Sequence, residues 1–243
     1  RGLGTLARRC GTTFVGLLPG GQGQGRDQMT RVLQAGRKAP LSGETRSAVV
    51  FLHGYGANGA DLLGLADPLA EHLPDTLFVA PDAPESIPGM PFGLQWFPIP
   101  WIDGSSEEEA HRGLMTASAD LNAFLDALMV DEDLLPEQVV LFGFSQGSMM
   151  ALHVAPRREE ALAGVVAFSG RLLSPDLLED ETQSRPPVLL VHGDADEVVT
   201  VQSLPQAAEA LQGAGWQDVY AHIMKGTGHG IAPDGLSVAL AFM

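Results

Sequence analysis

One short segment of the sequence carries a pattern associated with nucleophilic catalysis. Gly143, Phe144, Ser145, Gln146 and Gly147 match G-x-S-x-G, in which a serine occupies a sharp turn between a strand and a helix. Glycines two residues before and after the serine let the chain double back and leave the hydroxyl accessible. A strand-like apolar run precedes the motif and a helix-like run follows it, so Ser145 is the predicted nucleophile.

A serine hydroxyl is a weak nucleophile at neutral pH and needs a histidine to accept its proton. In folds that carry this motif, the histidine comes last in chain order. His229 lies between two glycines just after the last predicted strand, and it is therefore the predicted base. His222, inside that strand, is the alternative.

The histidine in turn needs a carboxylate that fixes its tautomer and stabilises its protonated form. Asp194 and Asp196 both follow a predicted strand and both lie between the serine and the histidine in chain order. An aspartate in such a loop is otherwise commonly a turn former or a helix cap. The residue pattern alone does not choose between the two.

Hydrolysis of an ester passes through a tetrahedral oxyanion, which backbone N–H groups stabilise well. The Gln146 amide is one predicted donor, because it begins a helix and has no partner within that helix. The Tyr55 amide is the other, from the glycine-rich segment that follows the first predicted strand. Since only backbone groups are invoked, replacing Gln146 by alanine is expected to cost little activity.

These residues require elements that bring distant loops to one edge of a sheet. Short apolar runs alternate with segments of helical period, which is the pattern of βαβ units. The runs are continuously apolar, as in strands covered on both faces. We therefore predict an α/β fold with a mostly parallel central sheet and helices on both faces. Strands are predicted over residues 48–52, 76–80, 138–142, 163–168, 188–191 and 218–223, and helices over 60–73, 107–128, 147–155 and 204–212.

The first 28 residues differ in composition from the rest of the chain. They are rich in glycine and carry four arginines against one aspartate, and their apolar stretch is too short for a convincing signal peptide. Residues 1–28 are interpreted as a disordered extension, or as residues foreign to the native protein. Residues 29–243 are predicted to form one catalytic domain.

Composition limits the classes of binding partner and the cellular compartment that we expect for this protein. A formal net charge of −16 disfavours binding to nucleic acid or to anionic lipid surfaces. The chain has no continuous apolar run long enough to span a membrane. Its single cysteine, Cys10, allows no intramolecular disulfide, and no zinc or iron–sulfur ligand pattern is recognisable. We expect a cytoplasmic protein without a metal, and without stable membrane association.

Four blocks together resemble the phospholipase/carboxylesterase family of α/β-hydrolases: LHGYGANGADL, GFSQGSMMAL, VHGDADEVV and GTGHGI. The family includes bacterial carboxylesterases and acyl-protein thioesterases. The resemblance implies cofactor-free hydrolysis of esters or thioesters, with Asp196 as the acid and His229 as the base. It likewise implies oxyanion donors at Tyr55 and Gln146, and an acyl-site wall formed by Trp96 and Phe97. A homodimer is compatible with it.

The expected activity is a serine carboxylesterase that acts on short- to medium-chain esters through an acyl-enzyme intermediate, with a small-molecule acyl ester as the substrate. The GYGANGADL segment is closer to the bacterial carboxylesterases than to the thioesterases. An acyl-protein thioesterase or a lysophospholipase on the same fold is the first alternative. A non-catalytic, ligand-binding relative is the alternative from another class, and labelling by a fluorophosphonate would discriminate against it.

Overall fold

The structure is a computed structural model that describes residues 30–243, so the predicted extension over residues 1–28 lies outside the described residues. A seven-stranded sheet in the order β1-β3-β2-β6-β7-β8-β9 forms its centre. All neighbouring strands are parallel except β1, which is antiparallel to β3. The strands are β1 (Ala35–Lys38), β2 (Ser47–Leu52), β3 (Thr76–Pro81), β6 (Val139–Phe144), β7 (Gly164–Phe168), β8 (Val188–Gly193) and β9 (Val219–Met224).

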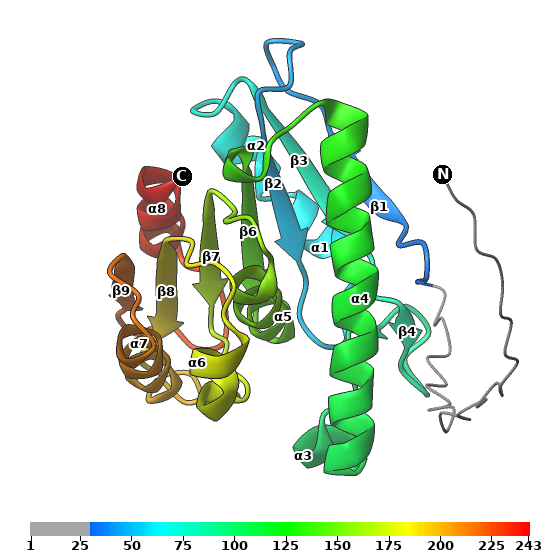
Figure 1. The fold of residues 1–243 in the computed structure, drawn as a ribbon, viewed down its shortest axis with the longest axis vertical. Helices are drawn as coiled ribbons and strands as arrows, with labels where there is room; N and C mark the ends of the chain where they lie inside the picture. Colours follow the sequence, from blue (N-terminus) through cyan, green and yellow to red (C-terminus); the bar gives the residue numbers. More distant parts are fainter. Residues whose placement is uncertain (1–29) are drawn as a thin grey trace, which may run out of the picture.

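Two layers of helices cover the sheet, which confirms the predicted α/β architecture (Figure 1). Helices α4, α5 and α7 contribute to the core on one face, and α1, α2 and α8 to the core on the other. The helices are α1 (Gly59–Leu63), α2 (Ala66–Ala70), α3 (Pro100–Asp103), α4 (Glu107–Glu132), α5 (Gln146–Val154), α6 (Leu178–Glu181), α7 (Ser203–Gly213) and α8 (Pro233–Phe242).

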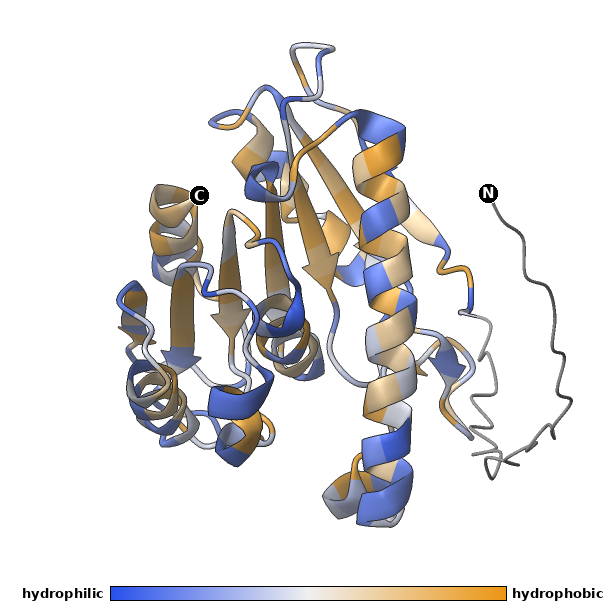
Figure 2. Ribbon diagram, in the orientation of Figure 1, coloured by the Kyte–Doolittle hydropathy of each residue, from blue (hydrophilic) through white to orange (hydrophobic). Residues whose placement is uncertain are grey.

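Side chains alternate between the two cores along each strand, as the pleat of a strand requires. In β2, Val50 and Leu52 belong to one core, whereas Val49 and Phe51 belong to the other. Both sets are buried, which explains why the central strands are continuously apolar (Figure 2). Helix α4 mixes polar and apolar residues in the same view, since only one side of it packs on the sheet.

Several details of the predicted elements were wrong, and α8 was not among the predicted helices. The helix predicted over residues 60–73 is two short helices, because the chain leaves α1 at Gly64 before α2 begins. Strand β9 is an edge strand and is mostly exposed, so it is not covered on both faces. The other edge strand, β1, was not predicted: its Ala-Gly-Arg-Lys sequence has no apolar run, and pairing with β3 alone defines it.

The parallel arrangement gathers the loops that follow the strands at one edge of the sheet. The arrowheads of β2, β7 and β8 point to the end of the molecule where α3, α6 and β4 lie (Figure 1). Strand β4 (Glu85–Ser86) forms a small hairpin with β5 (Leu94–Gln95) at that end. Among residues 30–243, no helix has the length and apolar character to cross a membrane.

Candidate active site

Ser145 occupies a strained turn between β6 and α5. Its backbone has φ 54° and ψ −115°, a conformation that side-chain-bearing residues rarely adopt. Its N–H donates to the Phe168 carbonyl at the end of β7, at 2.8 Å, which ties the turn to the neighbouring strand. The surrounding structure thus holds the serine at the carboxyl edge of the sheet.

The two glycines of the motif are required by close backbone contacts. A Cβ atom on Gly147 would lie 1.8 Å from the Leu52 carbonyl oxygen, and one on Gly143 would lie 2.4 Å from the Ser148 nitrogen. Neither backbone atom can move aside without displacing a strand or a helix. The sequence pattern therefore reports the close approach of α5 to the ends of β2 and β6.

The structure brings His229 and Asp196 to Ser145 from loops far away in the sequence. His229 Nε2 lies 3.0 Å from Ser145 Oγ, and His229 Nδ1 lies 2.7 Å from Asp196 Oδ2. An ionised carboxylate only accepts hydrogen bonds, so Nδ1 carries the proton and Nε2 is free to accept the serine proton. The three side chains form one continuous hydrogen-bonded chain.

Asp196 is held in its ionised form. Burial of this carboxyl opposes ionisation and is the largest single influence on its pKa. Hydrogen bonds from His229 and from the Val199 and Val198 amides outweigh burial, so the pKa of Asp196 is lowered from its ordinary value. Both amides lie 2.9 Å from Oδ1, which leaves Oδ2 for the histidine.

The remaining candidates from the sequence lie outside this chain of hydrogen bonds. Asp194 Oδ1 accepts from the Gly226 amide at 2.6 Å, so it joins the loop after β8 to the loop after β9. His222 Nε2 lies 2.9 Å from Asp234 Oδ2, away from the serine. Of the two aspartates, only Asp196 thus contacts His229, and Asp194 contacts the Gly226 amide instead.

His192, which the sequence analysis did not single out, lies beside Asp196. Its side chain is buried, and Nε2 lies 2.7 Å from the Val199 carbonyl oxygen and 3.4 Å from Asp196 Oδ2. It thereby braces the loop that supplies both amides to Asp196. Its place directly after the apolar run of β8 was the available signal, but a histidine at a strand end has many ordinary explanations.

The two predicted oxyanion donors lie on segments next to Ser145. A Cβ atom on Gly54 would lie 3.2 Å from Ser145 Cβ, so the segment that carries Tyr55 borders the serine. Within residues 30–243, neither the Tyr55 nor the Gln146 amide has an intramolecular acceptor. Both N–H groups are therefore available to a substrate oxygen.

His53 fixes the shape of the segment that carries Tyr55. Its Nε2 accepts from the Ala83 amide at 2.9 Å, and its Nδ1 lies 2.8 Å from the Gly54 carbonyl oxygen. Burial lowers the pKa of His53, so the ring is neutral and both contacts are satisfied by one tautomer. The histidine of this HGYG segment thus has a structural role.

The Gln146 side chain has a role that the sequence analysis missed. It is fully buried: Oε1 accepts from the Trp96 amide at 2.9 Å, and Nε2 donates to the Phe97 carbonyl at 2.7 Å. The same residue thus carries a predicted oxyanion donor on its backbone and holds the Trp96–Phe97 segment with its side chain. The expectation that alanine at this position costs little activity does not follow from this geometry.

Trp96 and Phe97, the predicted wall of the acyl site, differ in their surroundings. Trp96 is fully buried, and its Nε1 donates to the His53 carbonyl at 2.9 Å. Phe97 lines a groove of about 380 Å³ together with Trp101, Leu172 and other residues of α3, α4 and the loop after β7. Of the predicted pair, only Phe97 therefore borders a groove.

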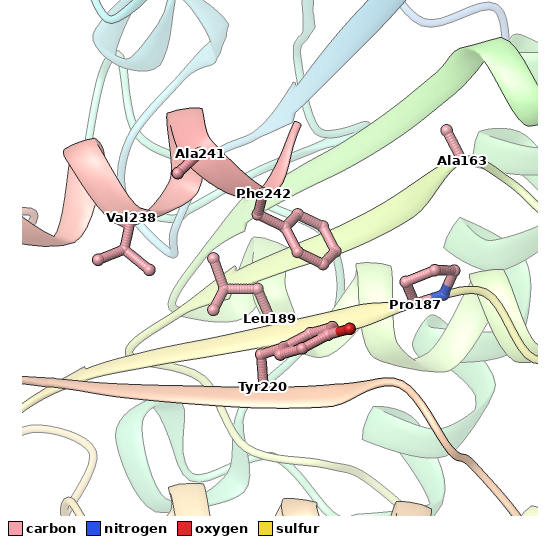
Figure 3. Close-up of a pocket in the computed structure, with 7 residues that line it drawn as sticks. All are labelled: Ala163, Pro187, Leu189, Tyr220, Val238, Ala241 and Phe242. Carbon is pink, nitrogen blue, oxygen red and sulfur yellow. The ribbon is translucent and has the colours of Figure 1, made fainter.

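A separate apolar groove of about 450 Å³ lies at the opposite edge of the sheet (Figure 3). Pro187 at the start of β8, Tyr220 of β9 and Phe242 of α8 line it. It contains none of the predicted site residues. Within the part of the chain that the structure describes, no three His, Cys, Asp or Glu side chains are grouped as a metal site requires.

Comparison with known proteins identifies the family of this chain. The phospholipase/carboxylesterase family profile matches residues 39–243. Acyl-protein thioesterase 1 of Saccharomyces cerevisiae is 30% identical over 211 residues, which are 82% of this chain and 92% of that protein. A crystal structure of esterase PE8 is 43% identical, with a TM-score of 0.82, and the match covers 87% of this chain and 98% of PE8.

Acyl-protein thioesterase 2 of Zea mays is a further solved relative. It is 25% identical, with a TM-score of 0.69, and the match covers 86% of this chain and 96% of the maize chain. Fold, family profile and relatives place the chain among the α/β-hydrolases that cleave esters. It belongs to the phospholipase/carboxylesterase family and is a serine-type ester hydrolase.

Proposed function

We propose that the protein is a carboxylesterase that hydrolyses short- to medium-chain esters through an acyl-enzyme on Ser145. The observation that carries this proposal is the hydrogen-bonded chain from Ser145 through His229 to Asp196, with distances of 3.0 and 2.7 Å. Each member has the atom that its role requires in contact with the next.

In the first half-reaction, Ser145 Oγ attacks the ester carbonyl while its proton passes to His229 Nε2. Asp196 stabilises the imidazolium that forms, because its lowered pKa keeps it ionised. The amides of Tyr55 and Gln146 donate to the oxyanion. The carbon–oxygen bond to the alcohol then breaks, and the alcohol takes the proton from His229.

In the second half-reaction, His229 Nε2 accepts a proton from water as that water attacks the acyl carbon. The bond from the acyl carbon to Ser145 Oγ breaks, and the serine regains its proton from the imidazolium. The products are a carboxylic acid and the regenerated enzyme. No step in this scheme needs a group from outside the chain other than water.

Thioester hydrolysis is the second candidate, and two of the relatives favour it. Acyl-protein thioesterases of Saccharomyces cerevisiae and Zea mays match along most of this chain. Esterase PE8, at 43% identity, supports oxygen esters instead. We place oxygen esters first because PE8 is more similar in sequence and in structure than those two thioesterases.

Rates on matched substrates test the proposal. We expect 4-nitrophenyl butyrate to be hydrolysed with a higher kcat/KM than butyryl or palmitoyl thioesters. In a series of esters of increasing acyl-chain length, kcat/KM should decline beyond medium length.

Ser145→Ala should lower kcat about 10⁶-fold and abolish labelling by a fluorophosphonate. Retained turnover in that variant would refute Ser145 as the nucleophile, and an unlabelled wild type would favour a non-catalytic role.

A further inference from the structure

Arg171 differs from the other arginines that the structure describes. Arg185 donates to a backbone carbonyl, and six more make ion pairs with carboxylates. Arg171 has neither an ion pair within 4.0 Å nor a hydrogen bond among residues 30–243, in a chain with 30 acidic and 14 basic residues. The six paired arginines are Arg31, Arg37, Arg46, Arg112, Arg157 and Arg158.

The Arg171 guanidinium stacks on an exposed tryptophan. Its central carbon lies 5.0 Å from the centre of the Trp101 ring, and 55% of Trp101 is exposed. Stacking engages the flat face of the guanidinium and leaves the N–H donors on its edge free. Those donors form the planar fork that binds a carboxylate through two parallel hydrogen bonds.

Arg171 follows a residue that packs against the backbone of the proposed nucleophile. That residue is Gly170, at which a Cβ atom would lie only 3.1 Å from the Ser145 carbonyl oxygen. Arg171, Trp101 and Phe97 line the same 380 Å³ groove, and the Phe97 carbonyl is held by the Gln146 side chain. The groove that contains Arg171 therefore shares Phe97 with the segment that Gln146, the residue after Ser145, holds in place.

Two other ionisable side chains line this groove. Glu107 and His111 both come from the first two turns of α4. Glu107 makes no ion pair with Arg171 within 4.0 Å, although its charge opposes the binding of an anion. The remaining lining is largely apolar, with Pro98, Leu172 and Leu173 among it.

We propose that Arg171 binds a carboxylate of the substrate, so that the preferred substrates are esters that carry a free carboxylate in their acid or alcohol portion. This inference rests on the proposed esterase function and adds a substrate class to it. The stacked guanidinium supplies two donors, and the apolar lining accepts the carbon chain between the carboxylate and the ester.

Matched substrate pairs test this inference in the full-length chain. For the acid portion, monoethyl adipate is compared with ethyl hexanoate; for the alcohol portion, 4-butyryloxybenzoate is compared with phenyl butyrate. The measured quantity is the ratio of kcat/KM for the charged ester to that for the neutral ester. We expect Arg171→Gln to lower this ratio about tenfold in one of the pairs, and Arg171→Lys to lower it less.

The chain offers a matched control. Arg185 also stacks on a tryptophan, with its central carbon 5.4 Å from the Trp216 ring centre, but it does not line the groove. Arg185→Gln should keep the wild-type ratio. Glu107→Gln should raise the ratio, because it removes the opposing charge. The pair that responds identifies the portion of the substrate that enters the groove.

The two proposals fail in different ways. An Arg171→Gln variant that hydrolyses the neutral esters but keeps the wild-type ratio in both pairs would overturn carboxylate recognition and leave the esterase proposal intact. An equal fall in Arg185→Gln would also overturn it. A wild-type protein that cleaves none of the four esters would contradict the proposed carboxylesterase itself.

Discussion

Histidine and glutamine side chains near the two ends of the β6–α5 unit differ in their hydrogen-bond partners. His229, at the carboxyl edge of the sheet, has partners on both ring nitrogens. His153, near the far end of α5, is buried with no hydrogen bond to either nitrogen among the described residues. One histidine is arranged to exchange a proton, and the other is packed as an apolar ring.

The glutamines at the two ends of β6 make a similar pair. Gln138 accepts from the Leu135 amide and donates to the Arg46 carbonyl; Gln146 accepts from the Trp96 amide and donates to the Phe97 carbonyl. Both thus tie two backbone segments together, but only Gln146 does so beside Ser145. The comparison indicates that the position of a side chain, and not its residue type, decides whether it lies beside the proposed site or only joins parts of the fold.

After removal of the proposed nucleophile itself, the largest expected effect is at Asp196. Asp196→Asn keeps the shape of the side chain but favours the wrong histidine tautomer, so kcat should fall about 10⁴-fold on 4-nitrophenyl butyrate. Asp194→Asn is the matched control, because an asparagine oxygen can still accept from the Gly226 amide. Equal losses in the two variants would contradict the assignment of the acid.

A smaller loss is expected at Gln146. Gln146→Ala retains the backbone donor but leaves the Trp96 amide and the Phe97 carbonyl without partners, at about 1–3 kcal/mol. We expect kcat/KM to fall about 10- to 100-fold through displacement of the Trp96–Phe97 segment. Gln138→Ala loses equivalent bonds and should leave kcat/KM unchanged. If both variants were fully active, the side chain of Gln146 would have no positioning role.

Stability below neutral pH should depend on His153. Burial, followed by the charges of Arg157 and His111, lowers its pKa to about 3. The folded protein therefore keeps the ring neutral below pH 6.5, while the unfolded chain binds a proton. The free energy of unfolding should then fall by up to about 1.4 kcal/mol per pH unit between pH 6.5 and 3.

Urea unfolding of the wild type and of His153→Leu, measured at pH 7, 6 and 5, checks this expectation. The slope with pH should be smaller in the variant, because leucine cannot bind a proton in either state. The exposed His72 provides the control substitution, His72→Leu. Parallel pH profiles for wild type and His153→Leu would contradict the interpretation.

The smallest effect is expected at the amino edge of the sheet. A Cβ atom on Gly164 would lie 2.8 Å from Phe242 Cε1, so this ring packs directly on the start of β7. Phe242→Ala should lower the free energy of unfolding by about 1–2 kcal/mol, since the ring is only partly buried. Its kcat/KM should equal that of the wild type; a large loss of activity would link the groove of Figure 3 to catalysis.

Much of the fold followed from local sequence. Continuous apolar runs predicted β2, β3, β6, β7 and β8, because burial on both faces leaves no room for polar residues. Strand β9 was also predicted, although it is an edge strand and is not covered on both faces. The motif around Ser145 could also be predicted from the sequence. Its glycines are required because a Cβ atom at either position would clash with neighbouring backbone atoms. Strand β1 escaped notice because its pairing with β3, and not its composition, makes it a strand.

The sequence by itself predicted Ser145 as the nucleophile, the order of the six parallel strands and the loops that had to meet. Only the tertiary structure showed that Asp196 contacts His229 and that His192 binds the loop that carries Asp196. It also showed that the Gln146 side chain binds the Trp96–Phe97 segment. These contacts join residues that lie up to 50 positions apart in the chain. Side-chain direction over such separations depends on packing, which periodicity and local propensity do not encode.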